Sequence, residues 1–169
     1  MKYFRIIRTI VLSTDMPLWK YCAITSLLLF STTTAINFSV RRVMELIGIK
    51  EKEPIILSTI SSGISTIDLL IITAIGPLIE TILLSAIAFI LSYVIKNKYF
   101  ICIVCALMIA FTHKVEIWFG YIVFINIFFQ STIFYLVRSK ISYLNGFIAA
   151  IIPHSVNNLI IVSTLLYIK

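Results

Sequence analysis

One acidic side chain in this sequence occupies a place where an acid is costly. Glu80 lies in the run Leu69–Ile95, which contains no other charged residue. A carboxylate at membrane depth costs roughly 2.5–3.5 kcal/mol on insertion scales, so it rarely occurs there without a function. His113 closes the next apolar run, and His154 lies inside the last one. One buried acid and two imidazoles on three runs favour a reaction centre.

The last apolar run adds an amide to this set. Asn158 follows His154 by four residues, so the two side chains share a helix face about one turn apart. Pro153 precedes His154 and cannot donate the usual backbone hydrogen bond, which would bend the helix toward a cavity. Asn126 and Gln130 are spaced in the same way, and either face this cavity or make ordinary polar contacts between helices. We favour the second interpretation for that pair.

The elements that must hold these residues are apolar runs of about twenty residues, the length that crosses ~30 Å of hydrocarbon. Hydrophobic residues make up 60% of the 169-residue chain, and the runs do not alternate as the strands of a membrane β-barrel do. We predict an all-α fold, a polytopic transmembrane helix bundle in which residues 1–169 form a single membrane domain. About five spans are expected, between four and six: Tyr21–Val40, Ile67–Ile95, Tyr99–Thr112, Ile117–Val137 and Tyr143–Ile168.

The segments around the first two spans carry further predictions. Residues 1–20 interleave basic and apolar side chains, and we expect them to lie as an amphipathic helix on an anionic membrane surface. Ile55–Thr66 is rich in Ser, Thr and Gly and is either a re-entrant or half-length helix or part of one long helix. Asp68 is expected to cap the helix that follows, and Gly76-Pro77 to kink it.

The charge and the cysteines exclude other classes of protein. The net charge of +7 comes from Lys and Arg residues clustered between the apolar runs. Basic residues anchor membrane proteins in this way, so membrane lipid is the expected partner and nucleic acid is not. Cys22, Cys102 and Cys105 all lie in apolar runs and are interpreted as small core residues rather than metal ligands.

A shared depth connects the acid and the two histidines. If the spans that adjoin Lys96–Lys98 and Arg138–Ser142 meet one membrane face, Glu80, His113 and His154 all lie about 20–22 Å from it, at 1.5 Å per residue. Each group alone has a structural interpretation: a protonated acid, an interfacial histidine, or a hydrogen-bonding contact between helices worth ~0.6–2 kcal/mol. Their common level favours a site.

Three short motifs follow one another in this part of the chain. Gly76–Thr81 places Glu80 behind a glycine–proline step, Ile109–His113 ends in histidine, and His154–Asn158 reads His-x-x-x-Asn. Over about Ile67–Leu166, this ordered set resembles the CPBP family of intramembrane proteases, also called the type II CAAX prenyl endopeptidase or Abi family.

The chain departs from the family's motifs at three positions. The family has a second Glu directly after the first and an Arg four residues further on, whereas this chain has Thr81 and Ser85 there. The family's Phe-x-x-x-His motif keeps His113 but has Ile109 in place of the phenylalanine. The second Glu and the Arg are the partners that would orient Glu80, so their loss bears on how strong catalysis is.

The resemblance implies hydrolysis of a peptide bond inside the membrane, without a covalent intermediate and without a cofactor. Glu80 with His113 would polarise a water molecule and act as general base. His154 and Asn158 would donate hydrogen bonds to the oxyanion of the tetrahedral intermediate. Two histidines and one glutamate also form a familiar catalytic zinc set, which is the minority alternative.

We therefore expect an intramembrane glutamic-type endopeptidase that cuts a small hydrophobic or membrane-bound peptide. Members of the family serve peptide maturation, peptide export or bacteriocin self-immunity, and the expected location is the bacterial cytoplasmic membrane. The alternative is a non-catalytic immunity or scaffold protein that binds a toxin or a transporter through the same cavity. A proton pathway is less attractive, because the polar residues form one layer rather than a chain across the membrane.

Overall fold

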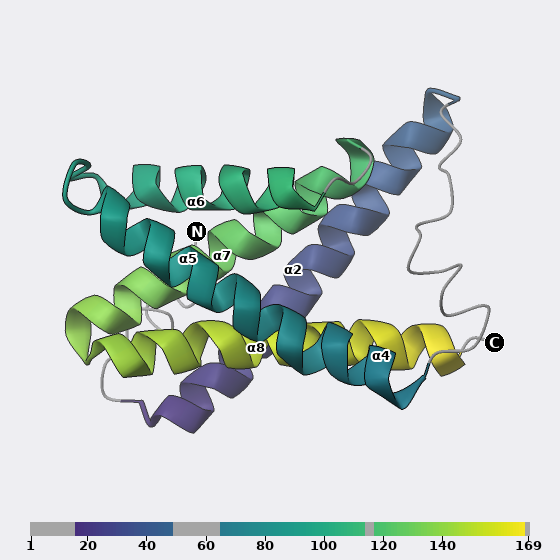
Figure 1. Ribbon diagram of the computed structural model, residues 1–169. Coiled ribbons are helices and arrows are strands. Elements are labelled where there is room, and N and C mark those ends of the chain that lie inside the picture. Colours follow the sequence, from purple (N-terminus) through teal and green to yellow (C-terminus); the bar gives the residue numbers. More distant parts are fainter. Residues whose placement is uncertain (1–15, 49–64, 114–116, 168–169) are drawn as a thin grey trace.

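The structure is a computed structural model that describes residues 16–48, 65–113 and 117–167. In these residues all the regular structure is helical. The predicted all-α class is confirmed (Figure 1). In chain order the elements are α2 (Leu18–Leu46), α4 (Thr66–Leu70), the π-helical segment η1 (Ile71–Ile75), α5 (Gly76–Leu91), α6 (Lys98–Thr112), α7 (Ile117–Lys140) and α8 (Tyr143–Tyr167).

Four helical regions are long and apolar enough to cross a membrane. They are Leu18–Leu46, Thr66–Leu91, Gly120–Lys140 and Tyr143–Thr164, and α6 is a shorter apolar helix. These helices indicate an integral membrane protein. Helices therefore occur at all five predicted spans, and the third, α6, has 15 residues, which is less than the ~20 needed to cross the hydrocarbon unaided.

The first helix is longer than the predicted span Tyr21–Val40. α2 continues past the paired arginines to Leu46, because arginine and glutamate are good helix formers. Arg42 Nη1 lies 3.1 Å from Glu45 Oε2, a pair three residues apart that supports an exposed helical turn. Residues 1–15 and 49–64 lie outside the described residues, so the amphipathic N-terminal helix and nearly all of the segment predicted at Ile55–Thr66 stay predictions.

The prediction that Asp68 caps the second span is confirmed, although Asp68 does so as the third residue of the helix and not as the N-cap residue. Ser65 is the N-cap residue, and its Oγ accepts a hydrogen bond from the Asp68 N–H at 3.1 Å. The Asp68 carboxylate accepts in return from the Ser65 N–H at 3.2 Å. This reciprocal capping box satisfies two orphan donors at the start of α4.

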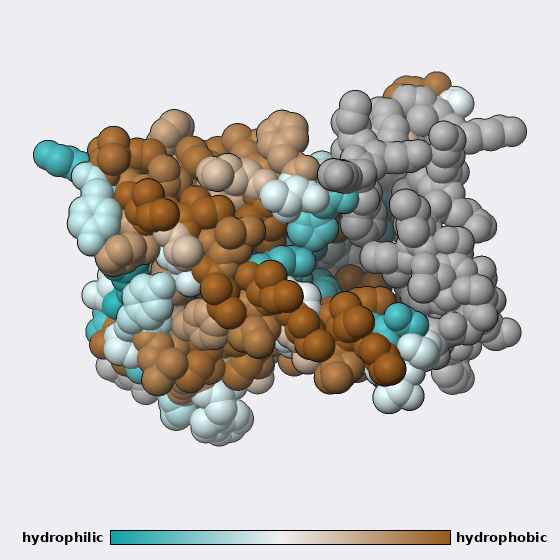
Figure 2. All heavy atoms as spheres, in the orientation of Figure 1, coloured by the Kyte–Doolittle hydropathy of each residue, from teal (hydrophilic) through white to brown (hydrophobic). Residues whose placement is uncertain are grey.

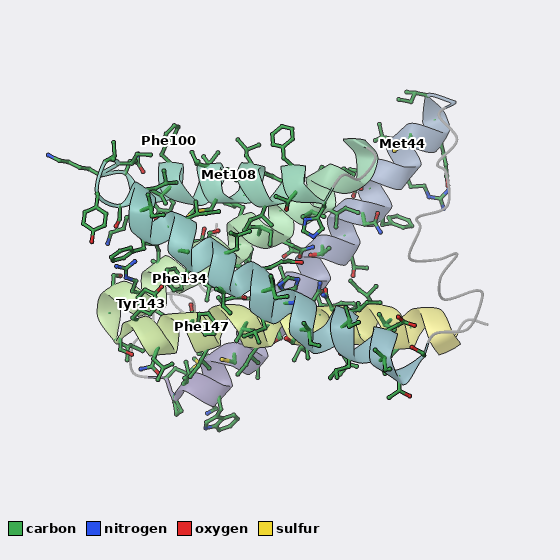
Figure 3. The ribbon with its side chains drawn as sticks, in the orientation of Figure 1. Met44, Phe100, Met108, Phe134, Tyr143 and Phe147 are labelled. Carbon is green, nitrogen blue, oxygen red and sulfur yellow. The ribbon has the colours of Figure 1, made fainter. Side chains whose placement is uncertain are left out.

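The last two long helices pack closely because of one glycine. α7 and α8 are antiparallel neighbours joined by a short turn, and α7 also packs against α6 while α2 crosses α8 (Figure 1). A Cβ added at Gly146 would lie 2.8 Å from Phe134 O and 2.9 Å from Arg138 Cβ. Small residues allow such backbone approach between membrane helices. At the same end of the hairpin the Phe134 and Tyr143 rings meet edge to face, 5.4 Å apart (Figure 3).

The main core lies where α5, α6 and α7 meet. Leu84 and Ala88 of α5 pack there with Ile109 of α6 and with apolar residues of α7. Tyr135 Oη donates a hydrogen bond to Ala88 O at 2.8 Å and ties α7 to α5. The three cysteines are buried free thiols, Cys102 and Cys105 in this core and Cys22 on α2, which confirms their interpretation as core residues.

Candidate functional site

The second span changes its helical form just before Glu80. η1 is a π-helical turn, and the Gly76 N–H that ends it donates a hydrogen bond to Ile71 O. A Cβ at Gly76 would lie 3.1 Å from that same oxygen, so glycine suits this close approach. Pro77 follows at the start of α5 and has no N–H to donate to a carbonyl of the preceding turn. The kink was predicted at Gly76-Pro77, and the structure has a π-helical turn directly before these two residues. Such turns often mark functional sites.

Glu80, His113 and His154 meet although they come from three separate helical regions. His113 Nε2 lies 3.2 Å from Glu80 Oε1, and His154 Nε2 lies 3.6 Å from Glu80 Oε2. Each carboxylate oxygen therefore faces one imidazole. The second distance is slightly longer than a hydrogen bond. The structure brings together the three ionisable residues that the sequence singled out.

The three side chains differ in how far they are exposed. The Glu80 and His113 side chains are 22% and 29% exposed, whereas that of His154 is 8% exposed. Figure 2 shows hydrophilic side chains gathered near the middle of a face that is otherwise largely hydrophobic. His154 is therefore the most buried of the three side chains, and Glu80 and His113 are partly accessible.

The hydrogen bonds of His113 define where one proton must lie. Its Nδ1 is 2.9 Å from Ile109 O, and a carbonyl oxygen can only accept, so Nδ1 carries a hydrogen. A neutral imidazole then has a bare Nε2, which cannot bind an ionised carboxylate. The contact with Glu80 Oε1 therefore contains a proton, either on His113 or on Glu80. In both forms the pair has no net charge, which lowers the cost of placing it inside a membrane.

His154 lies inside α8, which continues as an α-helix through Pro153. Pro153 lies inside the helix directly before it, and both residues are buried. His154 Nδ1 and the neighbouring Asn157 Oδ1 are buried and have no hydrogen-bond partner among the described residues. The His-x-x-x-Asn pattern drew attention to Asn158 and away from Asn157. Asn157 follows His154 by three residues, which puts both side chains on the same helix face. This spacing was the sequence signal that could have singled out Asn157.

Asn158 does not point its amide at the carboxylate. Its Nδ2 donates a hydrogen bond to Ile72 O, inside the π-helical turn, at 3.0 Å. The prediction grouped Asn158 with the ionisable residues, and the structure places it one turn further along α8, against η1. Only one of the two amide hydrogens is used by this contact.

The positions that depart from the family's motifs are filled by hydroxyls that bind their own helix. Thr81 Oγ1 donates to Pro77 O at 2.7 Å, and Ser85 Oγ donates to Ile82 O at 2.8 Å. Both residues are buried. Both hydroxyls are therefore engaged with their own helix, and within the described residues the Glu80 carboxylate faces the two imidazoles.

Asn126 and Gln130 differ from each other. Asn126 Oδ1 accepts a hydrogen bond from Thr33 Oγ1 at 3.0 Å and so joins α7 to α2, which is the ordinary contact between helices that we favoured. Gln130 is fully buried, and both polar atoms of its carboxamide have no hydrogen-bond partner in the described part of the chain. Within the described residues, neither side chain forms a hydrogen bond with Glu80.

Within the described ranges, no group of three or more His, Cys, Asp or Glu residues is arranged to hold a metal ion. Glu80 Oε1 lies 3.2 Å from His113 Nε2, and Glu80 Oε2 lies 3.6 Å from His154 Nε2. The zinc alternative gains no support from this geometry.

Comparisons with protein-family models, with curated proteins and with solved structures found no significant match to this chain. The resemblance to the CPBP family therefore rests on the three motifs, and family membership stays a prediction.

Proposed function

We propose that this protein is an intramembrane endopeptidase of the glutamic type. Its substrate is a small hydrophobic or membrane-bound peptide, and its role is peptide maturation or bacteriocin self-immunity in the bacterial cytoplasmic membrane. The observation that carries the proposal is the Glu80 carboxylate, with one oxygen 3.2 Å from His113 Nε2 and the other 3.6 Å from His154 Nε2. An acid placed in this way at membrane depth is rare without a function.

The chemistry follows from the proton that His113 and Glu80 share. In the form with a charged imidazole, Glu80 is an ionised carboxylate and removes a proton from a water molecule as the water oxygen bonds to the peptide carbonyl carbon. The carbonyl electron pair moves to its oxygen. Glu80 then returns the proton to the amide nitrogen as the carbon–nitrogen bond breaks. His113 stabilises the ionised carboxylate before the attack.

His154 is the proposed donor to the oxyanion. The attacking oxygen and the oxyanion belong to the same tetrahedral carbon, so their partners in the protein must be neighbours. His154 Nε2 is 3.6 Å from the base, which satisfies this requirement, and His154 is buried, where such donation is strongest. We do not assign Asn158 to the oxyanion, because its Nδ2 donates a hydrogen bond to Ile72 O.

A peptide substrate suits the surroundings of the site. The described residues are almost entirely helical, with no extramembrane domain among them that could recognise a folded protein. Glu80 and His113 are partly exposed, and Glu80 lies within an apolar helical region while His113 lies at the end of another. A short apolar peptide can reach Glu80 there by lateral movement in the membrane.

One observation favours the second candidate, a non-catalytic immunity or scaffold protein. Thr81 and Ser85 stand where the family has residues that orient the acid, and both hydroxyls are bound to their own helix. A site that lost these partners could bind a toxin or transporter segment without cutting it.

The two candidates are separated by one isosteric substitution. Glu80→Gln keeps the shape of the side chain but cannot take a proton from water, so peptide cleavage should fall at least about 100-fold. The measurement is mass spectrometry of small membrane-associated peptides from cells with wild-type protein, with Glu80→Gln, or with no protein. Glu45→Gln is the matched control, because Glu45 is an exposed carboxylate on α2 paired with Arg42.

Peptide fragments that appear with the wild type and the control but not with Glu80→Gln support the endopeptidase. Immunity or export that survives Glu80→Gln unchanged, with no fragments in any sample, contradicts it and favours the binding protein.

A further inference from the structure

The π-helical turn in the second span takes the two usual backbone donors away from one carbonyl. Ile72 O would accept from the N–H of residue 76 in an α-helix and from that of residue 77 in a π-helix. The Gly76 N–H donates to Ile71 O instead, and residue 77 is proline, which has no N–H. Both of the usual backbone partners of Ile72 O are therefore lost.

Asn158 supplies a donor from another helix. Its Nδ2 lies 3.0 Å from Ile72 O. A backbone carbonyl without a donor is costly in apolar surroundings, and water is not present in the bilayer core to replace the missing bond. The contact between α8 and η1 therefore stabilises the π-helical turn.

The π-helical turn in turn sets the direction of Glu80. A π-helical turn holds one more residue than an α-helical turn, so every side chain after it is rotated by about 100° relative to an uninterrupted α-helix. Glu80 follows η1 in the first turns of α5, and its carboxylate contacts both imidazoles in this register. An uninterrupted helix would turn Glu80 away from at least one of them.

We infer that Asn158 is a positioning residue: through Ile72 O it holds the π-helical turn, and the turn aims Glu80 at His113 and His154. This role differs from the oxyanion donation that the family resemblance implies for Asn158. Its consequence for cleavage rests on the function proposed above, whereas the contact itself and its effect on Glu80 do not.

A double-mutant cycle with Pro77 tests this role. Pro77→Ala restores a backbone N–H that can satisfy Ile72 O. In the wild-type background, Asn158→Leu should lower the folded-to-unfolded ratio in mixed micelles roughly tenfold, because it leaves a part-buried acceptor unpaired in apolar surroundings. In the Pro77→Ala background the same substitution should change that ratio by less than about twofold.

The matched control is Asn157→Leu, which replaces the same side chain type on the same helix. Asn157 is buried and its Oδ1 has no hydrogen-bond partner among the described residues. Its effect on the folded-to-unfolded ratio should be the same with Pro77 and with Pro77→Ala.

A second measurement reports on Glu80 directly. Nitrogen-15 NMR of the His113 side chain distinguishes an Nε2 that shares a proton with a carboxylate from one that does not. Asn158→Leu should move this signal toward that of an imidazole without a carboxylate partner, and Asn157→Leu should leave it in place. A loss of stability alone would not shift the signal of the folded protein.

Equal stability losses in both backgrounds, or an unchanged His113 signal in Asn158→Leu, would overturn the inference. If Asn158→Leu alone does not fold, recovery of folded protein in the Pro77→Ala background supports the inference and failure to recover contradicts it. If the wild type cleaves no peptide, the proposed function fails, but the cycle and the NMR signal still decide the role of Asn158.

Discussion

Two groups of buried polar residues in this protein behave differently. Glu80, His113 and His154 reach across from three helical regions and contact one another through their side chains. Four serine and threonine hydroxyls on α2 and α7 instead donate to carbonyls three or four residues earlier in their own helices: Thr25, Ser26, Ser131 and Thr132. Both groups are polar and lie in apolar spans.

The difference shows which polar residues in a membrane helix point to a site. A hydroxyl can satisfy itself on its own helix, so its presence requires no partner elsewhere. A carboxylate has no hydrogen to donate to a carbonyl, and an imidazole such as that of His113 bonds its own helix through one nitrogen only. The remaining polar atoms require that helices be brought together around them. Self-bonded hydroxyls are compatible with any bundle, whereas the Glu80 centre constrains the bundle's geometry.

The largest expected difference between the groups is in cleavage. His154→Ala removes the proposed oxyanion donor and should lower cleavage of a substrate peptide by about 100- to 1,000-fold. Ser131→Ala removes an equally buried polar group whose Oγ donates to Ile127 O at 2.6 Å, and it should change cleavage less than about twofold. Both are measured as initial rates on purified protein in lipid vesicles.

The folded fraction of each variant must be compared alongside the rate, because both residues are buried. A rate loss for Ser131→Ala as large as that for His154→Ala, at equal folded fraction, would remove the distinction between the two groups.

The sequence was sufficient to predict the fold class and the meeting of the ionisable residues. Apolar runs of span length dictate helices in a membrane, because only helices and closed barrels satisfy their backbone groups there. Depth counted along each run placed Glu80, His113 and His154 at one level, and the structure joins them. Counting works here because the rise per residue of a helix is constant.

The sequence could not show the partner of Asn158 or the π-helical turn. Glycine followed by proline predicts a break in a helix, but the form of the break depends on which helix supplies a donor for Ile72 O. That donor is distant in sequence and is chosen by packing. In the same way, the pairing of Asn126 with Thr33 depends on α2 crossing near α7, which no pattern in either helix specifies.

Gln130 belongs to neither group, and the change in stability on its substitution shows which group it resembles. Its carboxamide is fully buried without a hydrogen-bond partner among the described residues, so Gln130→Met should raise the free energy of unfolding by about 1 kcal/mol. Asn126→Leu is the control of opposite sign, because it breaks the bond to Thr33 and should lower that free energy by ~0.6 kcal/mol. The measurement is reversible unfolding in mixed micelles. A loss of stability in Gln130→Met would mean that Gln130 has a partner in the protein and belongs with the residues that reach across helices.

The smallest effect is expected next to the proposed base, at Thr81. Thr81→Val keeps the shape of the side chain and removes a hydroxyl that donates to Pro77 O in its own helix, so the free energy of unfolding should change by less than about 0.5 kcal/mol and cleavage by less than about threefold. Proximity in sequence to Glu80 would then have no consequence for activity, because a hydroxyl bound to its own carbonyl cannot orient a neighbouring carboxylate. A cleavage loss of tenfold or more with unchanged stability would mean that Thr81 orients Glu80, as the family's second Glu is expected to do. A hydroxyl bonded to its own helix would then also contribute to a site.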